Sequence, residues 1–125
     1  PVDTTSKLRE LIEKALVRVP ALDRKEAVKK SCARTFQALR IDVNSEFEVL
    51  EAFLQKLPDV LNPGGRVAVL TFHSGEDRLV KKSFKENVKA GIYSEAVKDV
   101  IRPSAEECRC NSRAHSTKLR WAVRS

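Results

Sequence analysis

Polar side chains gather in residues 72–78, directly after an unbroken apolar run at residues 67–72. A run without alternation predicts a parallel strand that is covered on both faces. In open α/β sheets, ligands bind beyond the carboxyl ends of such strands. The side chains at this position include His73, Ser74, Glu76 and Asp77. An imidazole and carboxylates are suited to proton transfer, so these four residues are the candidate catalytic or site-lining residues.

A helix cap explains the same residues without any chemistry. Ser74 and Asp77 have the spacing of an N-terminal cap, for a helix that Gly91 would end. A serine hydrolase is disfavoured, because its nucleophile turn needs glycine two residues either side of the serine. Those positions are Phe72 and Glu76 in this chain. The cap and the ligand site both stay open.

Basic residues outnumber acidic ones, 24 to 17, giving a net charge of +7. Residues 102–124 contain six Lys or Arg and two Glu, a net charge of +4. This concentration indicates an anionic partner, with nucleic acid ahead of membrane. Arg113, Lys118 and Arg120 are the candidate phosphate contacts in this segment. The alternative is a solvated segment that keeps the domain soluble.

The cysteines do not form a zinc pattern. Cys108 and Cys110 stand one residue apart and His115 follows, whereas structural zinc requires four ligands. We therefore expect no metal, and reduced thiols in a reducing compartment. No apolar run approaches the roughly 18 residues of a membrane span, and we expect no signal peptide because residues 1–6 lack its pattern. The absence of methionine suggests a piece of a longer protein.

The spacing of apolar residues predicts a mixed α/β chain. We expect three helices, then a strand, a helix and two strands, at residues 7–19, 23–39, 45–61, 67–72, 74–90, 97–101 and 118–124. In the last strand, Leu119, Trp121 and Val123 alternate with basic residues and are expected to face the core. This order indicates the second half of a doubly wound sheet, with the first half missing.

Four stretches together match one family in order and approximate spacing. They are TFQALRIDVN at residues 35–44, PGGR at 63–66, FHSGEDRLVK at 72–81 and RAHSTKLR at 113–120. In these stretches the chain resembles the C-terminal part of the methyltransferases that modify N4 of a cytosine in small-subunit ribosomal RNA. Two positions depart from the family's usual pattern: Gly75 replaces a leucine and His115 an arginine.

The resemblance implies a fold and a division of labour. Residues 1–44 would end an inserted helical region near the substrate, and residues 45–125 would form the C-terminal half of a Rossmann-like methyltransferase domain. S-adenosylmethionine would be bound mainly by the N-terminal half, which this chain lacks, so we expect the segment alone to be inactive. Contacts to RNA would come from Arg40, Arg78, Lys81, Arg113, Lys118 and Arg120.

The expected partners are ribosomal RNA in the small subunit and the missing N-terminal half, with self-association open. The expected location is the cytoplasm, or an organelle for a eukaryotic parent. A second function class also remains: a non-catalytic RNA-binding or ribosome-assembly module that keeps these motifs.

Overall fold

The computed structural model describes residues 1–125, which divide into two compact units, residues 1–46 and 47–125. The first unit contains α1 (Thr5–Ala15) and α2 (Ala21–Asn44). The Thr4 side chain caps α1 by accepting a hydrogen bond from the backbone N–H of Lys7, at 3.2 Å. The Arg24 guanidinium then donates to two carbonyls of the α1–α2 connection. None of the helices combines the length and the apolar composition needed to cross a lipid bilayer.

Two helix boundaries differ from the expected starts at residues 23 and 45. Pro20 is the N-cap of α2, so Asp23 lies inside the first turn instead of capping it. Proline's fixed φ suits the start of a helix, so α2 begins before residue 23. Ser45 does not cap α3 (Glu46–Val60), because it takes a left-handed conformation (φ 50°) as the C-cap of α2. Pro58 lies inside α3.

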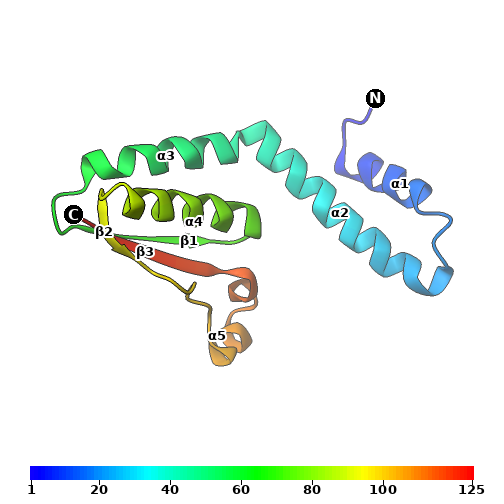
Figure 1. Ribbon diagram of the computed structural model, residues 1–125. Coiled ribbons are helices and arrows are strands. Elements are labelled where there is room, and N and C mark those ends of the chain that lie inside the picture. Colours follow the sequence, from blue (N-terminus) through cyan, green and yellow to red (C-terminus); the bar gives the residue numbers. More distant parts are fainter. The chain divides into compact units, whose positions relative to one another are not determined.

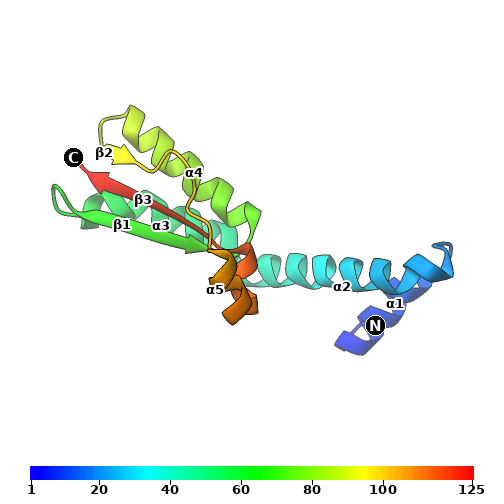
Figure 2. The ribbon, with the colours of Figure 1, turned by 90° about the horizontal axis from the view of Figure 1, so that it is seen from below.

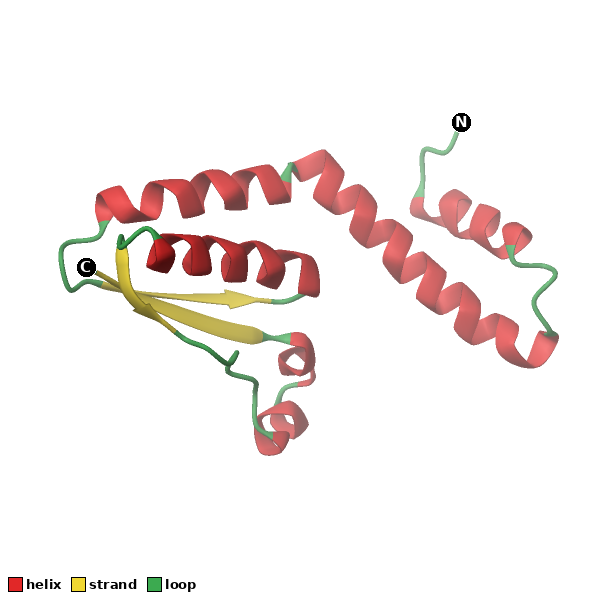
Figure 3. Cartoon of the chain, in the orientation of Figure 1, coloured by secondary structure: helices red, strands yellow, loops and turns green.

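The second unit is a three-stranded sheet with helices (Figures 1 and 3). Besides α3, this unit contains β1 (Arg66–Thr71), α4 (Ser74–Lys89), β2 (Tyr93–Ala96), α5 (Ala105–Cys110), the 3-10 helix η1 (Ser112–Ser116) and β3 (Lys118–Arg124). The strand order is β1-β3-β2, and both pairings are antiparallel. Gly91, with φ +74°, ends α4 as expected, because the left-handed conformation costs glycine little.

The core of this unit lies on one face of the sheet, under α3 and α4. Its buried side chains come from both helices and from β2 and β3: Leu54, Leu57, Val80, Phe84, Tyr93 and Ala122. Phe84 and Tyr93 pack edge to face, with ring centroids 5.8 Å apart. Figure 2, seen from below, shows the strands in front of α3; on this opposite side only the short α5 region lies near one end of the strands.

The apolar run of β1 was placed correctly, but its surroundings were not. β1 is an edge strand, antiparallel to β3, and Leu70 on its open face is 52% exposed. An apolar run shows which side chains a strand carries. It does not show whether this chain itself provides the helices that would cover both faces of the sheet. The predicted parallel strand buried on both faces is therefore wrong for this chain.

The other two predicted strands also need correction. β3 forms as expected, but Arg120 and Ala122 face the core while Leu119, Trp121 and Val123 lie on the opposite, open face. Residues 97–101 form no strand, and only Ile101 bridges to Leu119. β2 lies earlier, at Tyr93–Ala96. The short helices α5 and η1 were not predicted.

Candidate functional site

The candidate site is the turn between β1 and α4. His73 is the N-cap of α4, with extended backbone angles (φ −147°, ψ 162°). Its Nδ1 accepts a hydrogen bond from the backbone N–H of Glu76, at 3.4 Å. The cap is therefore His73 and not Ser74, which is the first residue of the helix. A serine cap was the expectation because hydroxyls are the commoner acceptors at this position.

Glu76 folds back over the same turn. Its Oε1 accepts a hydrogen bond from the backbone N–H of Phe72, at 3.3 Å. Together His73 and Glu76 satisfy two backbone N–H groups near the start of α4, much as a capping box does. The capping pair is one residue earlier than the Ser74–Asp77 pair that the spacing predicted. Because only Oε1 is used, Oε2 remains as a second acceptor of the carboxylate.

The His73 imidazole is held against α3. Its ring contacts Phe47 edge-on, with centroids 5.7 Å apart and planes at 65°, and its side chain is only 15% exposed. Nε2 lies 3.2 Å from Glu76 Oε1. This contact is not a hydrogen bond, and the buried Nε2 is left without a hydrogen-bond partner. The pair is therefore a close contact that leaves the donor capacity of the imidazole unused.

Gly75 is what allows this packing. A Cβ at residue 75 would lie 2.8 Å from Cζ of Phe47 and 3.2 Å from Nδ1 of His73. Both distances are shorter than ordinary van der Waals contact, so any larger residue would push the aromatic ring or the imidazole away. The absence of a side chain at Gly75 therefore coincides with Phe47 packed against the turn.

Asp77 turns away from the other polar residues and pairs with β3. Arg120 Nε donates to Asp77 Oδ1 at 2.7 Å, and Nη2 donates to Oδ2 at 3.2 Å. Both residues are buried, at 8% and 7% exposure. The hydrogen bonds from Arg120 hold the pKa of Asp77 below its usual range, against the opposing effect of burial. In this chain these two candidates are committed to each other.

The remaining candidates of this unit lie at the surface. Ser74, Arg78 and Lys81 are exposed and lie on one side of α4, at helical spacing. Arg113 is exposed in η1, where its backbone N–H donates to Asn111 Oδ1. Lys118 begins β3, and its carbonyl accepts from the buried Thr71 hydroxyl at 3.3 Å.

Arg40 belongs to the first unit. Its guanidinium pairs with Glu46, with Nε 3.0 Å from Oε1 and Nη2 3.4 Å from Oε2. The structure thus brings His73 and Glu76 into one cluster, with Asp77 and Arg120 forming a separate pair. The catalytic and RNA-binding roles of all these residues stay predictions.

Cysteines and histidines form no centre in this structure. All three cysteines are free, and no three metal-ligating side chains come together. Sequence reasoning overlooked a different group, Lys85, Lys89 and Lys98, which line a groove together with Lys81. The four-residue spacing of Lys81, Lys85 and Lys89 was the available signal, because it places all three on one side of a helix.

Comparison with known proteins identifies the family of this chain. The sequence profile of the MraW methylase family matches residues 1–125. A protein named ribosomal RNA small subunit methyltransferase H 1, from Lachnoclostridium phytofermentans, is 69% identical over 99% of this chain and 34% of its own length. A protein of the same name from Agathobacter rectalis is 64% identical over 99% of this chain and 36% of its own length.

A more distant relative, ribosomal RNA small subunit methyltransferase H from Pseudothermotoga lettingae, is 44% identical over 99% of this chain and 40% of its own length. The chain thus spans about a third of the length of the most similar of these curated relatives.

Proposed function

Because this chain belongs to the MraW methylase family, we propose that it is the C-terminal part of an S-adenosylmethionine-dependent methyltransferase. The proposed acceptor is N4 of a cytosine in small-subunit ribosomal RNA. The observation that carries the proposal is the match over the whole chain, including relatives at 64% and 69% identity that are named for methylation of this RNA. The proposed partner is the small ribosomal subunit, and the proposed location is the cytoplasm.

We propose that the three strands continue into a larger Rossmann-like sheet in the longer protein. Two features support this. β1 is an edge strand with one side unpaired. Leu70 on its open face and Phe72 just after the strand are 52% and 54% exposed. A long apolar edge left free is a liability that a neighbouring strand and a second helix layer would remove.

The division of the chain supports the same assignment. The two compact units meet at residues 46 and 47. The proposed helical region comprises residues 1–44, and the proposed methyltransferase part comprises residues 45–125.

The turn after β1 does not fit the cofactor by itself. Its only glycine is Gly75, whose space is taken by Phe47 and His73. Its buried acid, Asp77, already pairs with Arg120. No free acidic strand end is left to hold a ribose, and no glycine turn is left to approach one. We therefore assign S-adenosylmethionine, the methyl donor of the proposed reaction, to the part of the protein outside this chain.

What this chain would contribute is the handling of the base. The lone pair of cytosine N4 is delocalised into the ring, so an acceptor must orient or remove an N–H proton during transfer. At the end of β1, Glu76 carries a carboxylate with a free oxygen, and His73 carries a buried donor nitrogen without a partner. We propose that these two residues line the base site. A base in structured RNA must first be turned out of its stack to reach such a site.

A chimera tests the proposal. In the Lachnoclostridium phytofermentans relative, the matching 124 residues are exchanged for those of this chain. Transfer of radiolabelled methyl groups to small-subunit particles should persist at a rate close to that of the relative. A folded chimera that binds the particles but transfers nothing would favour the non-catalytic RNA-binding module.

A further inference from the structure

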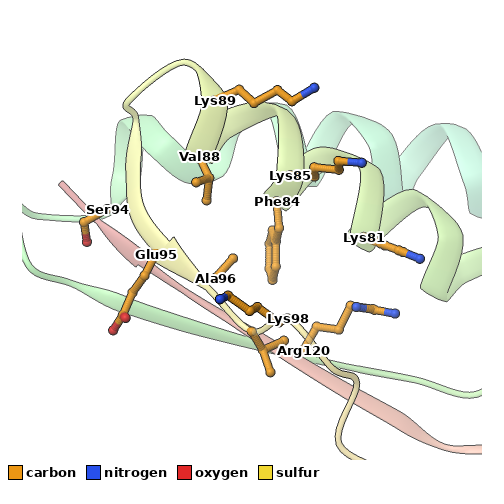
Figure 4. A pocket seen from close by; sticks show the side chains of 11 residues that line it. Lys81, Phe84, Lys85, Val88, Lys89, Ser94, Glu95, Ala96, Lys98 and Arg120 are labelled. Atoms are coloured by element: carbon orange, nitrogen blue, oxygen red, sulfur yellow. The ribbon is translucent and has the colours of Figure 1, made fainter.

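A groove separate from the turn runs between α4 and the segment at residues 94–98 (Figure 4). Its volume is about 550 Å³. Apolar side chains form its floor, from Phe84 and Val88 on α4 and from Ala96 and Val97 opposite. Lysines stand on its rims: Lys81, Lys85 and Lys89 on α4, and Lys98 on the other side. All four lysines are exposed.

The charges in this groove are almost entirely positive. None of the four rim lysines takes part in an ion pair. The ion pairs of the structure join other residues: Asp3–Lys7, Arg9–Glu13, Glu26–Lys30, Arg40–Glu46, Glu106–Arg109 and Asp77–Arg120. Arg120 closes one end, but its charge is balanced by Asp77. Glu95 is the one acidic residue of the lining, and Figure 4 shows its carboxylate pointing away from α4.

The helix separates its charges by side. Glu76 caps the start of α4, Asp77 is buried in its ion pair, and Glu86 lines a different groove next to α3. The side facing β2 therefore carries lysines without acids. Lys81, Lys85 and Lys89 recur every four residues, which is about 6 Å along a helix. This spacing is comparable to that of successive phosphates along one nucleic-acid strand.

We propose that this groove binds the phosphate backbone of RNA. The inference deepens the proposed function, on which it rests, by adding a binding surface away from the His73–Glu76 turn. Lysines are point charges without the fork of arginine, so they suit contacts that position a backbone without reading its sequence. A membrane fits poorly, because Phe84 is buried, at 2% exposure, and Ala96 and Val97 are half-buried, while the four lysines are exposed.

Charge removal at matched positions tests the groove. One variant carries Lys85→Gln with Lys89→Gln. The control carries Lys56→Gln with Lys82→Gln, which removes the same charge from exposed positions of α3 and α4 that do not line this groove. The probe is a fluorescein-labelled single-stranded oligouridylate, and its affinity for the whole 125-residue chain is measured by anisotropy over a range of KCl concentrations.

The groove variant should bind several-fold more weakly at low salt. Its slope of log affinity against log salt should become shallower by about 1.4, because each of the two lost phosphate contacts contributes about 0.7 for a single strand. The control should keep the wild-type slope. Equal slopes in both variants, or no binding by the wild type, would overturn the groove. Competition by polyglutamate would also overturn the proposal, if polyglutamate displaced the labelled RNA as well as unlabelled RNA does and lost this ability in the Lys85→Gln, Lys89→Gln variant. The groove would then fit an acidic polypeptide.

These outcomes are separable from those of the proposed function. A chimera that fails to transfer methyl groups, alongside a groove variant that loses RNA affinity, would remove the enzyme assignment and leave the groove standing. A chimera that transfers methyl groups, alongside equal slopes, would do the reverse.

Discussion

At the scale of single residues, the turn after β1 uses the same side chains for structure that the proposed chemistry would use. His73 and Glu76 bond backbone N–H groups at the start of α4, yet each keeps an atom unused: Nε2 of the imidazole and Oε2 of the carboxylate. Helix capping alone does not require an imidazole packed on an aromatic ring. The two roles separate in experiments, because capping affects stability and base handling affects turnover.

Glu76→Gln and His73→Ala should lower turnover more than stability in the active chimera. Gln keeps an acceptor for the Phe72 N–H, so the stability cost should be at most about 1 kcal/mol. Turnover should fall on the order of tenfold to a thousandfold if the carboxylate acts on the amine. Methyl transfer and melting temperature are measured together. Normal turnover in both variants would leave these residues as a cap alone.

Gly75 should tolerate a side chain only when Phe47 is reduced. Gly75→Ala gains helix propensity of up to about 1 kcal/mol. It also places a methyl group 2.8 Å from the Phe47 ring, and such overpacking costs about 1–3 kcal/mol. We expect the single variant to be destabilised, and the same change in a Phe47→Leu background to be neutral or stabilising. Urea unfolding of the four proteins of this cycle measures the coupling. Additive effects would mean that the ring moves aside freely.

At the scale of elements, the Asp77–Arg120 pair fixes α4 to the middle strand of the sheet. Two hydrogen bonds join residues 43 positions apart, and both side chains are buried. Removing one partner of such a pair leaves an uncompensated charge in the core. Asp77→Asn should therefore lower the free energy of unfolding at neutral pH by about 3 kcal/mol.

The pH dependence of this effect has a definite sign. The pKa of Asp77 lies below its ordinary value of 3.8 in the folded chain. Its contribution to stability is thus complete above that value and is lost as the pH falls through the lower folded pKa. The stability difference between wild type and Asp77→Asn should shrink on acidification below about pH 4. A stability difference between wild type and Asp77→Asn that stayed constant from pH 7 to the acid limit would contradict the pairing. The double variant Asp77→Leu with Arg120→Met removes both charges, so its free energy of unfolding at pH 7 should be close to that of the wild type.

The same pair explains why sequence patterns predicted the elements better than their surroundings. Periodicity found the four main helices, β1 and β3 to within a few residues, because it depends only on which side chains recur. Periodicity assigned the wrong face of β3 to the core. An arginine is normally expected to face solvent, but Arg120 is buried because Asp77, far away in the sequence, neutralises its charge. β2 was misplaced because Ser94 and Glu95 interrupt any apolar pattern.

The candidate site was predicted in part for a similar reason. The position of residues 72–78 between a strand and a helix follows from local pattern, and the structure confirms it. The identity of the cap does not, because it depends on Phe47 packing against His73. The groove lysines depend on the placement of residues 94–98 opposite α4, which no local pattern encodes.

At the scale of the whole molecule, helices cover one face of the sheet in the second unit, and the other face is open. Its core lies under α3 and α4, while β1 has an unpaired edge and an apolar face with exposed Leu70 and Phe72. A longer methyltransferase would complete both. The proposed division of labour is then spatial: cofactor binding outside this chain, base handling at the end of β1, and backbone phosphates along α4.

The most direct measurement is the identity of the atom that becomes methylated. Small-subunit particles from cells that lack the relative's gene are incubated with S-adenosylmethionine and the chimera, and the nucleosides of their ribosomal RNA are separated by mass spectrometry. The account predicts that N4-methylcytidine appears with the chimera and is strongly reduced with its Glu76→Gln form. A folded chimera that yields no N4-methylcytidine, or that methylates a different atom, would contradict it.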